Sequence, residues 1–494
     1  SRRKLMWVGV GALAVALALL VGAFRDRFAG LSQGGAEAPR IASIAVLPLG
    51  NFSGDPEQEY FSDGLTENLI ANLAKISALK VTSRTSVMRY KQTEKPLREI
   101  AGELGVDAII EGSAQRSGDR VRITAQLIDA KTDQHLWADT YDRPVADVLA
   151  LQSEVAREIA RQIRVTVTPE QENRLTSARK VNPAVYDAYL RGMFYVSQNT
   201  PESFEKGMKL LHEAVAIDPA EPLAYAGLAE GYVTLGHGGA EQPDAYPRAR
   251  AAAEQALKLD PNLAEAVGAL ADVALYYDWD WQKAENLFKR ALDLNPSLAM
   301  THYHYAWYLA LFDRLDEAIA EHKLARDLDP LRPLHTAWLG GLYLQAGRPD
   351  EAVAEVQKSI ELNPAFWPSY FVLCRAYLRM GMSEDAIVAA QRLIELEPVR
   401  GNVFLGVAYA QTGRTAQARA IAAMLEGAPA RSFQVAMLHA ALGDKDAAFR
   451  VLEAAYAVHP TALPWIRVHG LHDYDPLRED PRFQDLLRRM KLPG

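Results

Sequence analysis

Cysteine is almost absent from this sequence, and long runs of basic residues are missing altogether. Cys374 is the only cysteine among 494 residues, which excludes an intrachain disulfide framework and any zinc cluster built on cysteines. The net charge is −8, and without a Lys/Arg tract nothing matches the charge of a nucleic-acid backbone. We therefore predict that this part of the chain binds no nucleic acid.

The motifs of common enzymes are also missing. The sequence has no GxxxxGK[ST] phosphate loop, no HExxH zinc motif, no GxSxG elbow and no kinase HRD or DFG set. We predict that the chain is not an enzyme and that any catalytic domain would lie upstream of it. No catalytic residue, no cofactor and no metal site is predicted.

Three groups of potential metal ligands have simpler explanations. His302 and His304 point to different helix faces and need no shared explanation. His469 and His472 are spaced to share a helix face, but nearby glycine and proline disfavour a helix there. Four acidic residues follow the first predicted strand, where carboxylates cap helix amides and complement the helix dipole, so we favour capping over cation binding. These residues are Asp55, Glu57, Glu59 and Asp63.

The start of the chain is strongly apolar. Residues 5–24 run for 20 residues without a charge, which at about 1.5 Å per residue matches the roughly 30 Å hydrocarbon layer of a membrane. We predict a transmembrane helix there, in contact with the lipid bilayer. A cleaved signal peptide is the alternative, but its apolar region usually spans only about 7–15 residues.

The charges beside this segment predict its orientation. Basic residues precede it within residues 1–4, whereas the charges that follow it nearly cancel, so the positive-inside rule predicts a cytoplasmic stub at 1–4. Residues 25–40 are rich in Gly and Ala and predict a linker. The expected localisation is therefore the bacterial inner membrane, with a single pass, a cytoplasmic N-terminus and a periplasmic bulk.

The second half of the chain contains a repeat. A four-residue motif that ends in proline, such as DLNP or ELNP, recurs along this half of the chain. Its prolines stand at 219, 261, 296, 330, 364 and 398, with spacings of 42, 35, 34, 34 and 34 residues. Ten residues after successive prolines stands a small residue, which predicts closely crossing helices. These residues are Ala229, Ala271, Ala306, Gly340, Cys374 and Ala408. The pattern resembles the tetratricopeptide (TPR) family.

This resemblance predicts about eight helical pairs over residues 182–460, followed by a C-terminal capping helix region at 461–494. It implies a TPR superhelix whose concave groove is lined by the first helix of each pair and binds protein or peptide partners. Packing between repeats is the alternative role for any one groove residue. The implied groove positions are Glu230, Asp272, Tyr276, Tyr303, Trp307, Gln345, Phe371, Arg375, Arg379 and Tyr409.

Residues 41–165 predict an α+β domain with helices on one face of a mixed sheet. Strand signals alternate with helix signals at 97–105 and 148–163, and Ser117-Gly118-Asp119 predicts a hairpin between two strands. The stretches IAVLPL, YFSDGLTENLI, SRTSVMRYK and GVDAIIEGS resemble a domain similar to the TolB amino-terminal domain, found between a membrane helix and TPR repeats in bacterial signalling proteins.

A small polar pocket is conceivable in this TolB-like domain, but ordinary turn and salt-bridge roles are favoured. Its candidate residues are Asn51, Ser53, Arg84 and Arg116. Residues 166–181 are interpreted as a connector to the repeats. The predicted fold class is thus multidomain, with an N-terminal transmembrane helix, an α+β TolB-N-like domain and an all-α TPR superhelix.

These features predict a membrane-anchored periplasmic sensor or scaffold in bacterial signal transduction, forming the C-terminal part of a transmembrane transcriptional regulator. Signalling through one helix would require dimerisation or clustering. The resemblance leaves two alternatives open. The chain would be the regulatory half of a nucleotide cyclase or Ser/Thr protein kinase, or it would be an envelope-assembly factor with no output domain.

Overall fold

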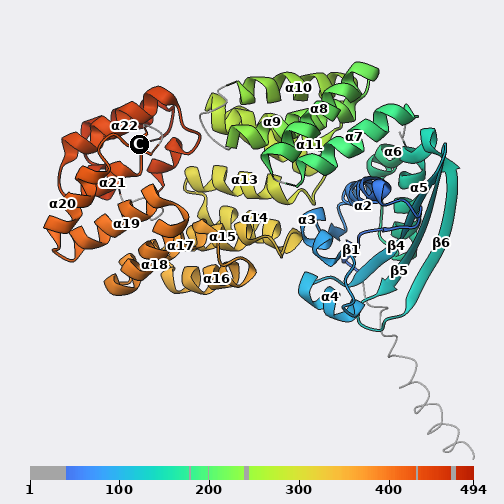
Figure 1. Cartoon of the computed structure of the whole chain (residues 1–494), viewed down its shortest axis with the longest axis horizontal. Helices are drawn as coiled ribbons and strands as arrows, with labels where there is room; N and C mark the ends of the chain where they lie inside the picture. Colours follow the sequence, from blue (N-terminus) through green and yellow to red (C-terminus); the bar gives the residue numbers. More distant parts are fainter. Residues whose placement is uncertain are drawn as a thin grey trace, which may run out of the picture. The chain divides into compact units, whose positions relative to one another are not determined.

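The computed structural model describes residues 41–176, 180–198, 200–237, 244–429, 432–468 and 474–493. Residues 42–494 form one compact unit. Within it, a mixed β-sheet with flanking helices precedes a long series of helices, which continues from α7 to the C-terminal elements (Figure 1).

The sheet combines parallel and antiparallel pairing. Its strand order is β3-β1-β4-β5-β6, with β1 parallel to β3 and β4, and β2 paired with β4. Residues of β5 alternate between exposed and buried, as expected for a strand with one face on the core. The strands are β1 (Ser43–Val46), β2 (Gly50–Asn51), β3 (Lys80–Val81), β4 (Ala108–Ser117), β5 (Arg120–Asp129) and β6 (His135–Pro144).

Two local predictions in this region are confirmed. Strands β4 and β5 form an antiparallel hairpin in which Ser117 pairs with Arg120, and Gly118 has the positive φ that this tight turn requires. The predicted helix closed by Gly105 ends with this residue in the left-handed conformation. The helices around the sheet are α2 (Glu59–Leu73), α3 (Arg84–Val87), α4 (Leu97–Leu104), α5 (Val148–Gln162) and α6 (Pro169–Thr176).

Eight helix pairs follow among the described residues. The first helix of a pair is buried around most of its circumference, as in α13, whereas the second is buried along one face, as in α12. The pairs are α7 (Pro183–Val196) with α8 (Pro201–Ile217), α9 (Pro222–His237) with α10 (Ala245–Leu259), α11 (Ala264–Val273) with α12 (Trp281–Leu294), α13 (Ala299–Leu311) with α14 (Leu315–Leu328), α15 (Pro333–Gln345) with α16 (Pro349–Leu362), α17 (Trp367–Arg379) with α18 (Ser383–Leu396), α19 (Pro398–Gln411) with α20 (Thr415–Met424), and α21 (Val435–Ala441) with α22 (Lys445–Val458).

The small residue that recurs ten positions after each proline has the predicted role. All six of these residues are buried. At Gly340, a Cβ atom would lie 2.6 Å from a methyl group of Val356 and 3.0 Å from the carbonyl oxygen of Ala352. The prediction that helices cross closely in this slot is therefore confirmed, because a larger side chain would force α15 and α16 apart.

The sheet region contacts the repeats through backbone and side chains near β3 and α3. The amide of Ser83 donates to the carbonyl oxygen of Leu328 at 2.7 Å. The hydroxyl of Ser86 donates to Asp329 Oδ1 at 2.5 Å, and both residues are buried. This contact fixes α3 against the turn between α14 and α15.

The prediction of a membrane-spanning helix and the localisation based on it are wrong. Spanning a bilayer takes about 20 consecutive apolar residues, but no helix of the described residues is long and apolar enough to cross one. The longest, α8, has 17 residues and carries several charges. This corrects both the fold class with an N-terminal transmembrane helix and the single-pass inner-membrane localisation. Residues 5–24 themselves lie outside the described residues.

Candidate functional site

Three first helices bring a carboxylate and two imidazoles together. His237 is the last residue of α9, Asp272 lies on α11 and His304 on α13. One potential ligand atom from each residue lies within 4.8 Å of the others. Asp272 Oδ2 and His304 Nε2 are 3.7 Å apart. We call these three residues the His/Asp cluster.

Two tyrosine hydroxyls flank the His/Asp cluster. The Tyr276 hydroxyl lies 2.7 Å from His304 Nδ1, and the Tyr246 hydroxyl lies 3.4 Å from His237 Nδ1. Tyr276 belongs to η4 (Ala274–Asp278), a π-helical turn that continues α11. Such turns are rare and are frequent at functional sites. The hydroxyls occupy the Nδ1 side of both imidazole rings.

Burial controls the protonation of this cluster. Asp272 is only 8% exposed, and its Oδ1 atom is buried without a hydrogen-bond partner. Burial raises the pKa of Asp272 well above its usual value. Burial, followed by the charges of His237 and other cationic groups, holds the pKa of His304 well below its usual value. The His304 imidazole is therefore neutral at pH 7.

The C-terminal part of the chain covers this region of the repeats. Trp465, in η5 (Leu463–Arg467), stacks on Tyr276 with ring centroids 5.4 Å apart and meets Trp307 edge-on at 6.5 Å. The Arg467 guanidinium donates to the carbonyl oxygen of Leu311, the last residue of α13. A segment far along the chain thus packs against the same first helices that carry the His/Asp cluster.

The ten predicted groove residues have different environments. Asp272, Tyr276, Tyr303 and Trp307 lie close to the His/Asp cluster or within the aromatic packing beside it. The structure does not give all ten the same access to solvent. The buried ones are Asp272, Tyr276, Trp307, Phe371 and Arg375, the half-buried ones are Tyr303, Gln345 and Tyr409, and the exposed ones are Glu230 and Arg379.

Glu230 lies apart from the others, in a cavity between the sheet region and the repeats. The cavity has a volume of about 200 Å³, and its wall includes Glu67, Glu265 and Lys75. Although Glu230 contacts solvent, enclosure by the surrounding protein and the charges of Glu67 and Glu265 raise its pKa to about 7. Its charge therefore changes near neutral pH.

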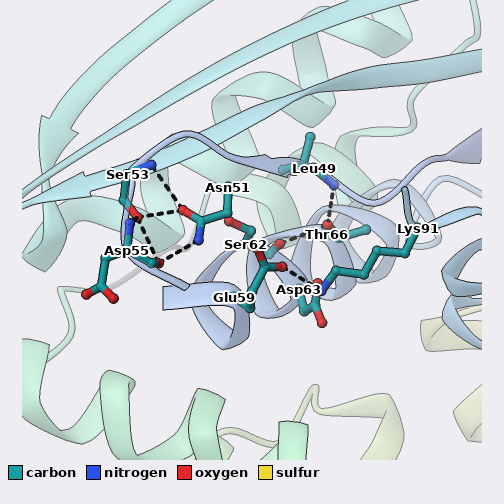
Figure 2. A network of polar contacts seen from close by, with 9 residues as sticks. All are labelled: Leu49, Asn51, Ser53, Asp55, Glu59, Ser62, Asp63, Thr66 and Lys91. Carbon is teal, nitrogen blue, oxygen red and sulfur yellow. Dashed lines mark hydrogen bonds and ion pairs between the residues drawn. The ribbon is translucent and has the colours of Figure 1, made fainter. Parts of the chain in front are cut away.

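The acidic residues after β1 form a local polar network, which Figure 2 shows. Asp55 accepts a hydrogen bond from the backbone amide of Glu57 at 2.9 Å and caps the short helix that precedes α2. Lys91 pairs with both Glu59 and Asp63 at 2.7 Å (Figure 2). The predicted capping role is therefore confirmed for Asp55.

The four residues considered for a polar pocket within residues 41–165 have separate local or salt-bridge partners. Arg84 pairs with Glu67 at 3.4 Å, and Arg116 pairs with Asp187 at 2.7 Å. Ser53 donates to Asn51 within one turn (Figure 2). The ordinary turn and salt-bridge roles predicted for these residues are therefore confirmed.

The histidine predictions have mixed outcomes. His302 contacts Glu321 and the carbonyl oxygen of Pro296, whereas His304 contacts Tyr276. The prediction that these two histidines serve different helix faces is confirmed. However, no sequence signal associates His304 with His237 and Asp272, because the three residues occupy different positions relative to the repeat prolines. His469 and His472 lie outside the described residues.

Comparison with known proteins identifies the repeats. Family models described as tetratricopeptide repeat match residues 274–333, 337–366 and 371–432. The predicted TPR repeats are therefore confirmed, and the chain contains a fold that binds protein or peptide partners and is typically a non-catalytic scaffold. The TolB-like resemblance has no counterpart among these matches.

Two curated relatives share a large part of this chain. A Rhizobium meliloti (strain 1021) protein that carries the name adenylate cyclase 3 is 36% identical over 284 residues, 57% of this chain and 42% of that protein. The transcriptional regulator HilA of Salmonella typhimurium is 26% identical over 306 residues, 60% of this chain and 52% of that protein. The chain thus spans about half, or less, of the length of these relatives.

Solved structures also resemble parts of this chain. PilW, titled a widely conserved type IV pilus biogenesis factor, is 22% identical and matches 40% of this chain and 93% of its own, with a TM-score of 0.36. YrrB, titled a TPR protein with an unusual peptide-binding site, is 18% identical and matches 39% of this chain and 97% of its own, with a TM-score of 0.29.

Proposed function

We propose that this chain is the regulatory, partner-binding part of a bacterial signal-transduction protein. The observation that carries the proposal is that relatives named for two different activities match it. The two matched stretches together exceed the length of the chain, so they overlap. The two relatives are named for different activities, so a segment that they share would not carry out either one. Partner recognition is a role that both proteins could use.

The output of the complete protein has two candidates. Transcriptional control is supported by the similarity to HilA, at 26% identity. Cyclic-nucleotide synthesis is supported by the higher identity, 36%, to the Rhizobium meliloti protein. The second candidate therefore has the stronger sequence support.

Partner recognition is assigned to the predicted groove residues that solvent reaches. Arg379, at the end of α17, is exposed, and Tyr409 on α19 is half-buried. Arginine and tyrosine are the residues that most often dominate binding energy at protein interfaces. Glu230 contributes separately from its cavity, where it would favour a basic side chain. The buried predicted residues, among them Phe371, would instead hold the helices together.

A peptide display library panned on the purified 494-residue chain tests this proposal. Affinities of the selected peptides would be measured by fluorescence anisotropy for the wild type and for Arg379→Ala. We expect the substitution to weaken binding by about tenfold or more, because truncating an arginine that a partner buries at the centre of an interface costs about 2 kcal/mol or more. Arg419→Ala is the matched control, since Arg419 is also exposed but lies on α20, the second helix of its pair.

The expected control result is an unchanged affinity for Arg419→Ala. If peptides bind but both variants behave like the wild type, the assigned surface is wrong. If no peptide binds at all, the proposed partner-binding role fails with it. A chimera that replaces the matched part of the Rhizobium meliloti protein with this chain tests the regulatory role, because its cAMP production should change on addition of a selected peptide.

A further inference from the structure

We propose that His237, Asp272 and His304 bind one divalent transition-metal ion, for which zinc is the best fit. The three residues come from the first helices of three successive repeats and converge within 4.8 Å. Two imidazoles and one carboxylate are a donor set that zinc accepts, together with a fourth ligand. The ion would therefore link α9, α11 and α13 where they approach one another.

The orientation of His304 suits a metal ligand. Its Nδ1 atom is engaged by the Tyr276 hydroxyl at 2.7 Å, which leaves Nε2 directed at Asp272 Oδ2, 3.7 Å away. With zinc-ligand distances of about 2.0 Å, two ligands of a tetrahedral site lie about 3.3 Å apart. This pair would need to approach by less than 1 Å. Tyr276 is the positioning residue, because partners on the second ring nitrogen fix the orientation of ligating histidines.

Asp272 provides an independent reason to expect a ligand. Asp272 is buried, and its Oδ1 atom is shielded from solvent and accepts no hydrogen bond. Burying an unpaired polar group of this kind is costly unless a hydrogen bond or an ion compensates for the lost hydration. A divalent cation would satisfy both oxygens and hold the carboxylate in its charged form. The neutral His304 ring needs no deprotonation before it binds.

The His237 ring would have to reorient before all three residues could coordinate one ion. It is parallel to the ring of His304 within 2°, with centroids 5.1 Å apart, so the two rings cannot direct lone pairs at one ion as they stand. His237 is exposed and ends α9, and its ring meets Tyr276 and Tyr246 edge-on. Turning the ring toward solvent would therefore open these two ring contacts. Metal binding would turn this ring out of the stack and fix the end of α9.

Water would complete the coordination of an ion held by these three residues. Among the described residues, the group of converging His, Cys, Asp and Glu side chains contains only these three members. Three protein ligands with an exchangeable fourth position are typical of zinc sites that bind a further ligand. The expected stoichiometry is therefore one ion per chain, with affinity that an added small anion can change.

The first test is a titration of the metal-stripped full chain with Zn²⁺ in competition with a chromophoric chelator. We expect one tight equivalent. His237→Ala and Asp272→Asn each remove a ligand and should weaken Zn²⁺ binding by at least about 100-fold. This exceeds the 10–100-fold loss that usually follows mutation of a residue hydrogen-bonded to a metal ligand. Tyr276→Phe should weaken it by about tenfold. Circular dichroism would confirm that each variant is folded, and the exposed position of His237 makes its variant the safest.

A matched control separates this site from incidental binding by surface histidines. His212 also lies beside a tyrosine hydroxyl, that of Tyr232 at 2.9 Å, but it belongs to α8 and lies outside the cluster. His212→Gln should bind Zn²⁺ as the wild type does. Substituting Co²⁺ gives a second readout, because its visible absorption distinguishes a four-coordinate protein site from the hydrated ion.

Several results would overturn the proposal. One is the absence of a stoichiometric site in the wild-type chain. Another is an affinity that falls in His212→Gln but not in His237→Ala. A third is a Co²⁺ spectrum that is the same for the wild type and Asp272→Asn. Because these readouts use no peptide, failure of the metal site would leave the proposed partner-binding role unaffected.

Discussion

Acid sensitivity of the repeat array should depend on buried histidines, and His322 offers the sharpest test. This α14 residue is fully buried beside Tyr303 and His335. Burial, with the charge of His335 as a second cause, holds the pKa of His322 well below its usual value of 6.5. At a pH between the pKa of His322 in the folded chain and its usual value of 6.5, this histidine binds a proton in the unfolded chain but not in the folded one. The free energy of unfolding must therefore fall as the pH drops below about 6.5.

The size of the effect follows from the unfolded state. At pH 5.5 a histidine with a pKa of about 6.5 is protonated in about nine chains of ten, and excluding that proton costs about 1.4 kcal/mol. The variant His322→Leu cannot titrate at this position. Its loss of stability between pH 7.5 and 5.5 should therefore be about 1.4 kcal/mol smaller than that of the wild type.

Urea unfolding at the two pH values, followed by tryptophan fluorescence, measures this difference. Trp307 lies 6.5 Å from His322, ring centre to ring centre, so the signal reports on this part of the array. His212→Leu, at an exposed position on α8, is the control and should lose as much stability as the wild type. An equal pH dependence in the wild type and in His322→Leu would refute the reasoning.

Four further substitutions test the packing of the fold. Trp465→Ala should cost about 3–5 kcal/mol, as truncation of buried aromatic residues does, and lower the melting temperature measured by circular dichroism. Gly207→Ala should cost about 1–3 kcal/mol, because a Cβ there would lie 2.7 Å from a backbone oxygen. Gly102→Ala, with no atom within 4 Å, should stabilise by about 0.4–1 kcal/mol in the same assay. Ser86→Ala removes the donor to buried Asp329 and should cost about 1–3 kcal/mol in urea unfolding.

The sequence predicted the parts of the fold that depend on patterns among residues close together in the chain. A hairpin needs only two alternating runs and a glycine that tolerates positive φ, and Gly118 meets this requirement. The repeats recur at a fixed period, so the small residue in each pair, such as Gly340, could be recognised by comparing the pairs. Both signals depend on residues within a few turns of one another.

The arrangement around the candidate site depends on contacts that no local pattern encodes. Trp465 stacks on Tyr276, although nearly 200 residues separate them. This packing helps to bury a predicted groove face that repeat geometry alone would leave open. Likewise, His237, Asp272 and His304 do not share a repeat position. Only the superposition of three successive helices brings them together, so neither spacing nor composition could have predicted the cluster.

The two proposals concern different parts of the repeat array, and this makes them separable. The His/Asp cluster lies on α9, α11 and α13, beside the packing of Trp465, whereas Arg379 ends α17. A change at Arg379 should therefore alter peptide affinity and leave the Zn²⁺ affinity unchanged, while His237→Ala should do the reverse. If Zn²⁺ instead changed peptide affinity in the wild type but not in His237→Ala, the metal would act as a regulator of partner binding. Linkage would then require the peptide to change Zn²⁺ affinity by the same factor.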